Sequence, residues 1–272
     1  MSLLIFLAWV AVGVAVGAYG TLIGAGGGFV LVPILLLVYP HQSPAQLTAV
    51  SLAVVLANAA SGSLSYYRMR RVDYRTGLIL AGATLPGAVA GAIVVGAIPR
   101  AAFDVIMGAG LVLVAAVLLV KPRGSIPLGL SGRFVASRAL VDSDDKRYAY
   151  RFNLALATLM SVGIGFLSSL LGIGGGIIHV PLLTTFFAFP AHIATATSHF
   201  VLMATSGAAT VTHIVHRDYG TFVGITLALA AGVVAGAQAG AAISRRIAGN
   251  SIIRLLALAL AVVGIRLLLL QA

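Results

Sequence analysis

Two glycine-rich runs are the residues best suited to bind a ligand, GAGGG at 24–28 and GIGGG at 172–176. Glycine reaches positive φ at no steric cost, so each run predicts a break within a helix. The N–H groups that start the following helix, together with the helix dipole, would form an anion site that needs no charged side chain. Alternatively, the glycines only let helices pack closely. The candidate ligands are Gly24, Gly26, Gly27, Gly28, Gly172, Gly174, Gly175 and Gly176.

Hydroxyl and amide side chains form a second candidate set. Ser51 and Asn58 are seven residues apart and share a helix face, and Ser198 and Thr205 repeat that spacing, with Thr197 beside them. Such groups hold an oxyanion by donating hydrogen bonds, and they release it more readily than Arg would. The alternative is that these hydroxyls bond back to their own helix or bridge two helices.

Two histidines lie within apolar segments, His179 and His199. Ionisable groups at membrane depth are costly, and histidine titrates near neutral pH, so either one is a candidate for coupling a proton to anion movement. The alternative is a neutral histidine that is hydrogen-bonded within the helix bundle. No histidine pair has metal-ligand spacing with carboxylate support, so neither a metal nor another cofactor is expected.

Enzyme chemistry is not expected. The chain has no cysteine, which excludes thiol nucleophiles and thiolate metal sites. Ser198 and His199 are adjacent, so on a helix they point about 100° apart and cannot act as nucleophile and base. No Gly-x-Ser-x-Gly motif is present, and neither glycine run is a P-loop or a dinucleotide fingerprint.

The composition indicates the elements that must position these residues. Of the 272 residues, 60% are hydrophobic and 8% are charged. A soluble domain carries about 25% charged residues, and a membrane span needs about 20 apolar residues. The 17 basic residues against 6 acidic ones lie between apolar blocks, as the positive-inside rule predicts, so nucleic-acid binding is not expected.

The two halves of the chain repeat. The glycine runs are offset by 148 residues, and the Asp-Tyr-x-Thr motifs at Asp73 and Asp218 are offset by 145. We expect an all-α integral membrane protein with about eight transmembrane helices in two homologous four-helix halves, each with a glycine-broken first segment. The expected ranges are 1–120 for the first repeat, 121–151 for a basic cytoplasmic linker and 152–272 for the second repeat. Each motif aspartate is expected to cap the helix that follows it.

Basic residues predict the orientation. With eight spans, the loop at 67–76, the central linker and Arg217 lie on one side together with both termini. Their excess of positive charge predicts that this side is cytoplasmic, so the protein would be N-in and C-in. A broken segment that crosses the membrane differently would change the parity and invert the second repeat.

The paired segments GAGGGFVLVP at 24–33 and GIGGGIIHVP at 172–181, with Ala-Thr-Ser at 196–198, resemble the TauE/SafE family of sulfite exporters. The resemblance implies a transporter of the inner membrane for small sulfur-containing anions, without saying which one. An anion channel, or a permease for another small metabolite, is the alternative. The expected partners are the small anion and the lipid bilayer, with a homodimer as a further possibility.

Overall fold

The computed structural model describes residues 2–119, 128, 134–244 and 249–269. It is mostly helical, as predicted, and five described helices are long and apolar enough to cross a membrane. Glycine and proline end or start many elements, and Ser2, Ser43 and Asn153 cap helix N-termini. The helices are α1 Leu3–Ile23, α2 Gly28–Val38, α3 Pro44–Arg68, α4 Tyr74–Val94, α5 Arg100–Leu119, α6 Leu154–Leu171, α7 Gly176–Pro181, α8 Ala191–Val215, α9 Val223–Ser244 and α10 Gly249–Leu269. Short turns of other helix types are η1 Val95–Ala97, η2 Leu182–Phe186 and η3 Gly220–Phe222.

Each glycine-broken segment folds back on itself. In the second one, a Cβ added to Gly175 would lie 2.9 Å from the Ser168 hydroxyl, and His179 Nε2 lies 3.2 Å from the Ser161 hydroxyl. The later residue of α7 thus lies beside the earlier residue of α6, so the two helices run antiparallel. The first segment does the same, because Tyr39 after α2 stacks on Trp9 near the start of α1, with ring centroids 6.3 Å apart. Both segments are therefore re-entrant.

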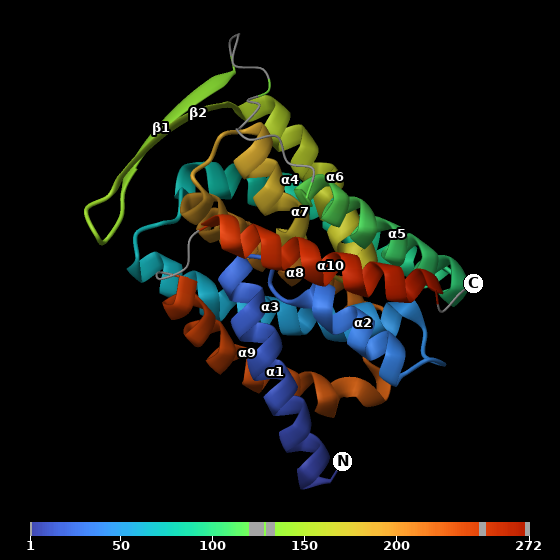
Figure 1. The fold of residues 1–272 in the computed structure, drawn as a ribbon. Helices are drawn as coiled ribbons and strands as arrows, with labels where there is room; N and C mark the ends of the chain where they lie inside the picture. Colours follow the sequence, from blue (N-terminus) through green and yellow to red (C-terminus); the bar gives the residue numbers. More distant parts are fainter. Residues whose placement is uncertain (1, 120–127, 129–133, 245–248, 270–272) are drawn as a thin grey trace.

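The molecule has two ends, which we call the hairpin end and the terminal end. At the hairpin end the Ser143 N–H donates to the Met69 carbonyl (3.0 Å), and the Leu128 N–H donates to the Phe186 carbonyl (2.9 Å). At the terminal end the Tyr39 and Phe222 rings are 5.0 Å apart. Helix α10 runs antiparallel to α5, so the last turn of α10 lies at the terminal end with the first turn of α1, away from the β-hairpin (Figure 1).

The predicted placement of loops is corrected by this arrangement. Arg217 follows α8 at the terminal end, opposite the loop after α3 and the hairpin, rather than beside them. The expected linker also lies at the opposite end from both termini. The physical reason is that a re-entrant segment returns to the end from which it started. Three crossing helices then separate the N-terminus from the linker, where the prediction had four.

The helices of the two sequence halves are interleaved. Helix α1 packs on α9, and α6 packs on α4 (Figure 1). Helix α3 packs on α8, and α5 packs on α10. Close approach depends on glycines of α4 and α9, because a Cβ at any of them would meet backbone atoms of the opposing helix. These positions are Gly87, Gly91, Gly232, Gly236 and Gly240. The first helix of each half is therefore held by the other half.

The expected linker contains a β-hairpin, formed by β1 Val135–Val141 and β2 Arg147–Asn153 in antiparallel register. The rest of the linker, 121–127 and 129–133, lies outside the described residues. One face of the hairpin is buried on α4, α6 and the end of the second re-entrant segment, with Phe152 0% exposed. A buried ion pair joins it to the loop after α3, with Arg71 Nη2 and Asp142 Oδ2 3.2 Å apart.

The predicted caps differ between the repeats. Asp73 caps α4, accepting from the Thr76 N–H at 3.1 Å, which confirms that prediction. The prediction for Asp218 is wrong. The turn η3 separates it from α9, and its carboxylate instead lies 2.7 Å from His213 Nδ1.

Candidate functional site

The two glycine runs have the same backbone conformation. The φ angles are 74°, 74° and 82° at Gly24, Gly26 and Gly27, and 68°, 80° and 86° at Gly172, Gly174 and Gly175. Side chains rarely adopt such angles, which is why glycine is needed at these positions. Each break is followed by an apolar helical stretch of eleven residues, Gly28–Val38 and Gly176–Phe186. The predicted breaks are therefore present in both segments.

The breaks leave peptide N–H groups unpaired. Among the described residues, no backbone acceptor is found for the N–H of Gly175 or Gly176, nor for the equivalent Gly27 and Gly28. These are the orphan donors that every helix start carries. Two adjacent donors at a helix N-terminus favour a negatively charged or strongly accepting ligand.

A small cavity lies against the second break. About 170 Å³ of space lies between its lining atoms, but this space is nowhere wide enough to hold a water molecule, so the cavity is closed in this conformation. Six predicted residues line it: Gly174, Gly175, Gly176, His179, Ser198 and Thr205. Four residues that were not predicted complete it: Thr84, Ile164, Val201 and Leu202. The cavity lining carries no Asp, Glu, Lys or Arg.

The Ser198 hydroxyl is the exceptional polar group of this cavity. It is 0% exposed and has no hydrogen-bond partner among the residues that the structure describes. The neighbouring Thr205 hydroxyl donates to Thr84 Oγ1 at 2.7 Å, and Thr84 Oγ1 donates to the Ala81 carbonyl at 2.8 Å. Because a buried hydroxyl without a partner costs free energy, Ser198 is the group that a ligand would satisfy.

His179 is held within the bundle. The Ser161 hydroxyl donates to the Ala157 carbonyl at 2.8 Å, so it accepts from His179 Nε2, which lies 3.2 Å away. This is the arrangement of the alternative given above, a histidine hydrogen-bonded to its neighbours.

Of the predicted residues of the first half, Asn58 lies in a separate polar cluster with Thr21 and His199. The Thr21 hydroxyl donates to Asn58 Oδ1 at 3.0 Å and lies 3.5 Å from His199 Nε2. Asn58 Nδ2 and His199 Nδ1 are buried, and no described residue forms a hydrogen bond with either atom. Ser51 lies elsewhere and donates to the Gly172 carbonyl at 2.7 Å, joining α3 to the second break.

Thr197 belongs neither to the cavity at the second break nor to the polar cluster around Asn58. Its hydroxyl accepts from the Asp73 N–H at 3.0 Å, next to the N-terminal cap of α4. The structure therefore places Thr197 in the packing of α8 on α4, near the hairpin end.

The two breaks touch and are not separated by a shared space. A Cβ on Gly28 would lie 2.7 Å from the Gly172 carbonyl oxygen, and one on Gly176 would meet the backbone of Gly24 and Ala25. The side chains of Val55 and Leu202 pack against both Gly26 and Gly174. The two glycine runs were expected to bind one anion between them. Instead, the second run lines a closed cavity, and the first run packs directly against the second.

Two kinds of residue escaped the sequence analysis. Thr84 has Leu229 at the corresponding repeat position, so the repeat comparison hides it. Val55 and Leu202 each follow the motif serine by four residues, Ser51 and Ser198 respectively. That spacing places them on the same helix face as the serines, a signal that could have identified both.

Comparison with known proteins connects this geometry to a family. A family model described as sulfite exporter TauE/SafE matches residues 9–267. The chain is 30% identical over 269 residues to the Bacillus subtilis protein named "Probable membrane transporter protein YunE", covering 97% of each chain. It is 25% identical over 270 residues to the Methanocaldococcus jannaschii protein named "Probable membrane transporter protein MJ0441", covering 95% of this chain and 93% of that one. No solved structure matches.

Proposed function

Because this chain belongs to the sulfite exporter TauE/SafE family, we propose that it is a secondary transporter that moves a small sulfur-containing anion, such as sulfite, thiosulfate or a related sulfonate, across the membrane. The family and both relatives are named as exporters or membrane transporters, so this chain is a membrane transporter. The proposal that the substrate is an anion depends on the geometry of the candidate site.

The proposed binding site is the cavity at the second break. The unpartnered Ser198 hydroxyl is the observation that carries this assignment. It would donate to one oxygen of the anion, while the free N–H groups of Gly175 and Gly176 would donate to others. Neutral donors stabilise an oxyanion without the strong attraction of a buried cation, so the anion is held and can leave.

The proposed layout is two homologous halves, 1–120 and 152–272, that face opposite directions, with 121–151 between them. Each half contributes one re-entrant segment and three crossing helices. Broken helices at the interface of inverted repeats are typical of secondary transporters that rock between two states. Separation of Val55 and Leu202 would widen the closed cavity as the halves rock. His199, with its unpartnered Nδ1, and His179 are the candidates for proton coupling.

The proposed orientation in a cytoplasmic membrane reverses the one predicted for the termini. Three of the 17 basic residues, Arg100, Arg217 and Arg266, lie at the terminal end. The other fourteen belong in sequence to segments that connect or flank elements at the hairpin end. The positive-inside rule therefore favours a cytoplasmic hairpin with both termini outside.

The test is uptake of labelled sulfite into proteoliposomes, with thiosulfate, sulfate, taurine and sulfoacetate as competitors. Ser198→Ala should lower the uptake rate roughly fivefold, the effect of about 1 kcal/mol from one lost neutral hydrogen bond. Ser206→Ala is the matched control, because Ser206 is equally buried in α8 but donates to the Leu202 carbonyl of its own helix. It should transport at the normal rate.

Each other outcome has a defined meaning. Transport by Ser198→Ala at the wild-type rate would contradict the proposal that the anion binds at the second break. Absence of competition by every sulfur anion would contradict the substrate class and favour a permease for another metabolite. Flux that ignores an imposed proton gradient would favour a passive channel over a proton-coupled transporter.

A further inference from the structure

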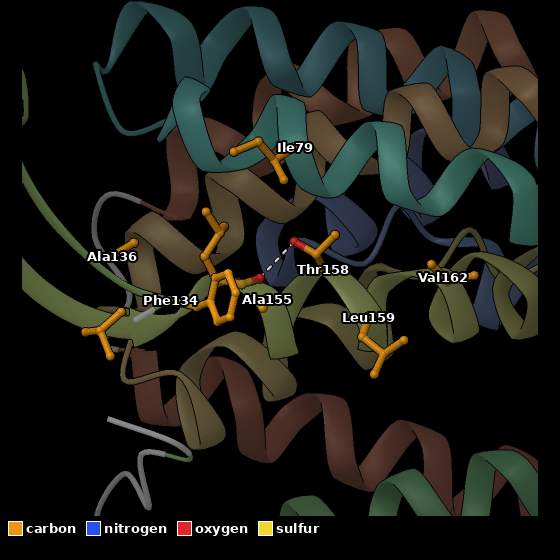
Figure 2. Close-up of a pocket in the computed structure, with 9 residues that line it drawn as sticks. Ile79, Phe134, Ala136, Ala155, Thr158, Leu159 and Val162 are labelled. Carbon is orange, nitrogen blue, oxygen red and sulfur yellow. Dashed lines mark hydrogen bonds between the residues drawn. The ribbon is translucent and has the colours of Figure 1, made fainter. Parts of the chain in front are cut away.

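An apolar groove lies on the outer surface at the hairpin end, between α4, α6 and the start of β1. Its volume is about 640 Å³. Figure 2 shows side chains of Ile79, Leu159 and Val162 along it, with Phe134 at the end nearest the hairpin. The Thr158 hydroxyl, which also lines the groove, donates to the Leu154 carbonyl at 2.8 Å and offers no free donor. The groove therefore suits a hydrocarbon chain.

The groove has the position and length of one leaflet. It starts where β2 passes into α6 and runs along α6 from Leu154 to Val162. Eight residues of α-helix rise about 12 Å, close to the roughly 15 Å depth of half a hydrocarbon core. Leu159 and Phe134 are 70% and 64% exposed, so they face the surroundings.

Two exposed arginines flank the hairpin end of the groove. Arg75 precedes Ile79 by one turn on the same face of α4. Arg151 is the register partner of Ser137, on the exposed face of the hairpin that also carries groove residue Val135. Both arginines are exposed, and neither forms an ion pair with any residue that the structure describes.

We propose that this groove binds an anionic phospholipid, with one acyl chain between α4 and α6 and the phosphate near Arg75, Arg151 and Ser137. Charge complementarity favours an anionic lipid, because a zwitterionic headgroup carries its own cation beside the phosphate and therefore leaves the net positive charge of the two arginines uncompensated. A separate hollow over Ser137, Ala139, Ala149 and Arg151 begins at the residue that follows groove residue Ala136 in β1, and it would hold the rest of the headgroup. The proposal depends on membrane insertion and not on the anion site.

The test is native mass spectrometry of the full chain in detergent, with phosphatidylglycerol and phosphatidylcholine of identical acyl chains. Phosphatidylglycerol should be retained preferentially. Each Lys or Arg near an anionic lipid contributes about 1 kcal/mol, so Arg75→Gln and Arg151→Gln should each lower its affinity about fivefold. Arg147→Gln, further along the same exposed hairpin face, is the matched control and should bind normally.

A second variant distinguishes the contribution of the acyl chain to binding from that of the headgroup. Ala155 lines the groove and is exposed, so Ala155→Trp fills the groove without disturbing the core, and it should weaken both lipids. Glycerol phosphate, the headgroup without chains, should not compete. Equal retention of the two lipids, unchanged affinity in both arginine variants, or competition by glycerol phosphate would each overturn the proposal.

Discussion

At the scale of single residues, the glycines differ in what they contribute. Gly175 is needed for its positive φ, whereas Gly176 has an ordinary helical backbone and is needed because the first break lies against it. Gly163, in α6, has open space around the position of a Cβ. Equal residue types in one segment therefore carry unequal constraints, and only the contact partners distinguish them.

Gly176→Ala and Gly163→Ala should change stability in opposite directions. The added methyl of Gly176→Ala would overlap the backbone of Gly24 and Ala25, which cannot move as a flexible side chain can. Overpacking of this kind costs about 1–3 kcal/mol. Gly163→Ala meets nothing within 4 Å and should gain about 0.5–1 kcal/mol from lower backbone entropy. Thermal unfolding in detergent measures both, and a stable Gly176→Ala variant would contradict the contact between the breaks.

At the scale of elements, the β-hairpin is the feature that changes the expected architecture most. Asp142 accepts from the N–H groups of Asp144 and Lys146 at the tip of the hairpin and from the Arg71 guanidinium. Burial alone would raise the pKa of Asp142, but these hydrogen bonds and the charge of Arg71 outweigh it and lower the pKa. The tip is thus tied to the loop after α3 by a charge pair far apart in sequence.

Asp142→Asn should destabilise the hairpin by about 1.5–3 kcal/mol, the contribution of hydrogen bonds to a charged group, because the buried Arg71 then keeps only its partly exposed partner Asp144. Asp145→Asn is the control, because Asp145 has a positive φ of 59° that Asn tolerates and the structure shows it no ion pair. Limited proteolysis within 135–153 reports the difference. Cleavage of Asp142→Asn at the wild-type rate would show that the pair does not hold the hairpin.

The same pair predicts a pH dependence. Because the folded pKa of Asp142 is lowered, its stabilisation is complete above the unfolded value of about 4 and is lost as pH falls through the folded value. The difference in unfolding temperature between the wild type and Asp142→Asn should therefore be constant near neutral pH and shrink below about pH 4.

At the scale of the whole molecule, the two re-entrant segments decide the topology. Each returns to its own end, so the N-terminus and the hairpin lie at opposite ends (Figure 1). In this topology most of the basic residues belong to segments at one end of the molecule, the hairpin end. Arg245, Arg246 and Arg254 follow α9 in sequence, and α9 ends at the hairpin end, to which most of the other basic segments belong.

Single-cysteine labelling tests this topology directly, because the chain has no native cysteine. His41→Cys lies in the loop before α3 at the terminal end, and Ala149→Cys lies on the exposed face of the hairpin. A membrane-impermeant maleimide should label position 41 in intact cells and position 149 only after permeabilisation. The reverse pattern would invert the orientation, and labelling of both positions from one side would contradict the re-entrant fold.

The sequence by itself determined the features that are local or additive. Membrane insertion follows from summed hydrophobicity, the break at Gly26 and Gly174 from the conformational freedom of glycine, and the cap at Asp73 from a three-residue spacing. That Ser198 and Thr205 share one face of α8 also followed from helical periodicity. Each of these depends on residues near one another in the chain.

Only the tertiary structure decided which way the chain turns after each break, because glycine permits both a straight continuation and a reversal. It also decided that Ser51 is bonded across to Gly172 while its repeat partner Ser198 has no partner, since that depends on atoms from another helix. The Arg71–Asp142 pair is likewise a contact over 71 residues. Long-range packing selects among conformations that local sequence leaves equal, and here that selection sets both the topology and the site.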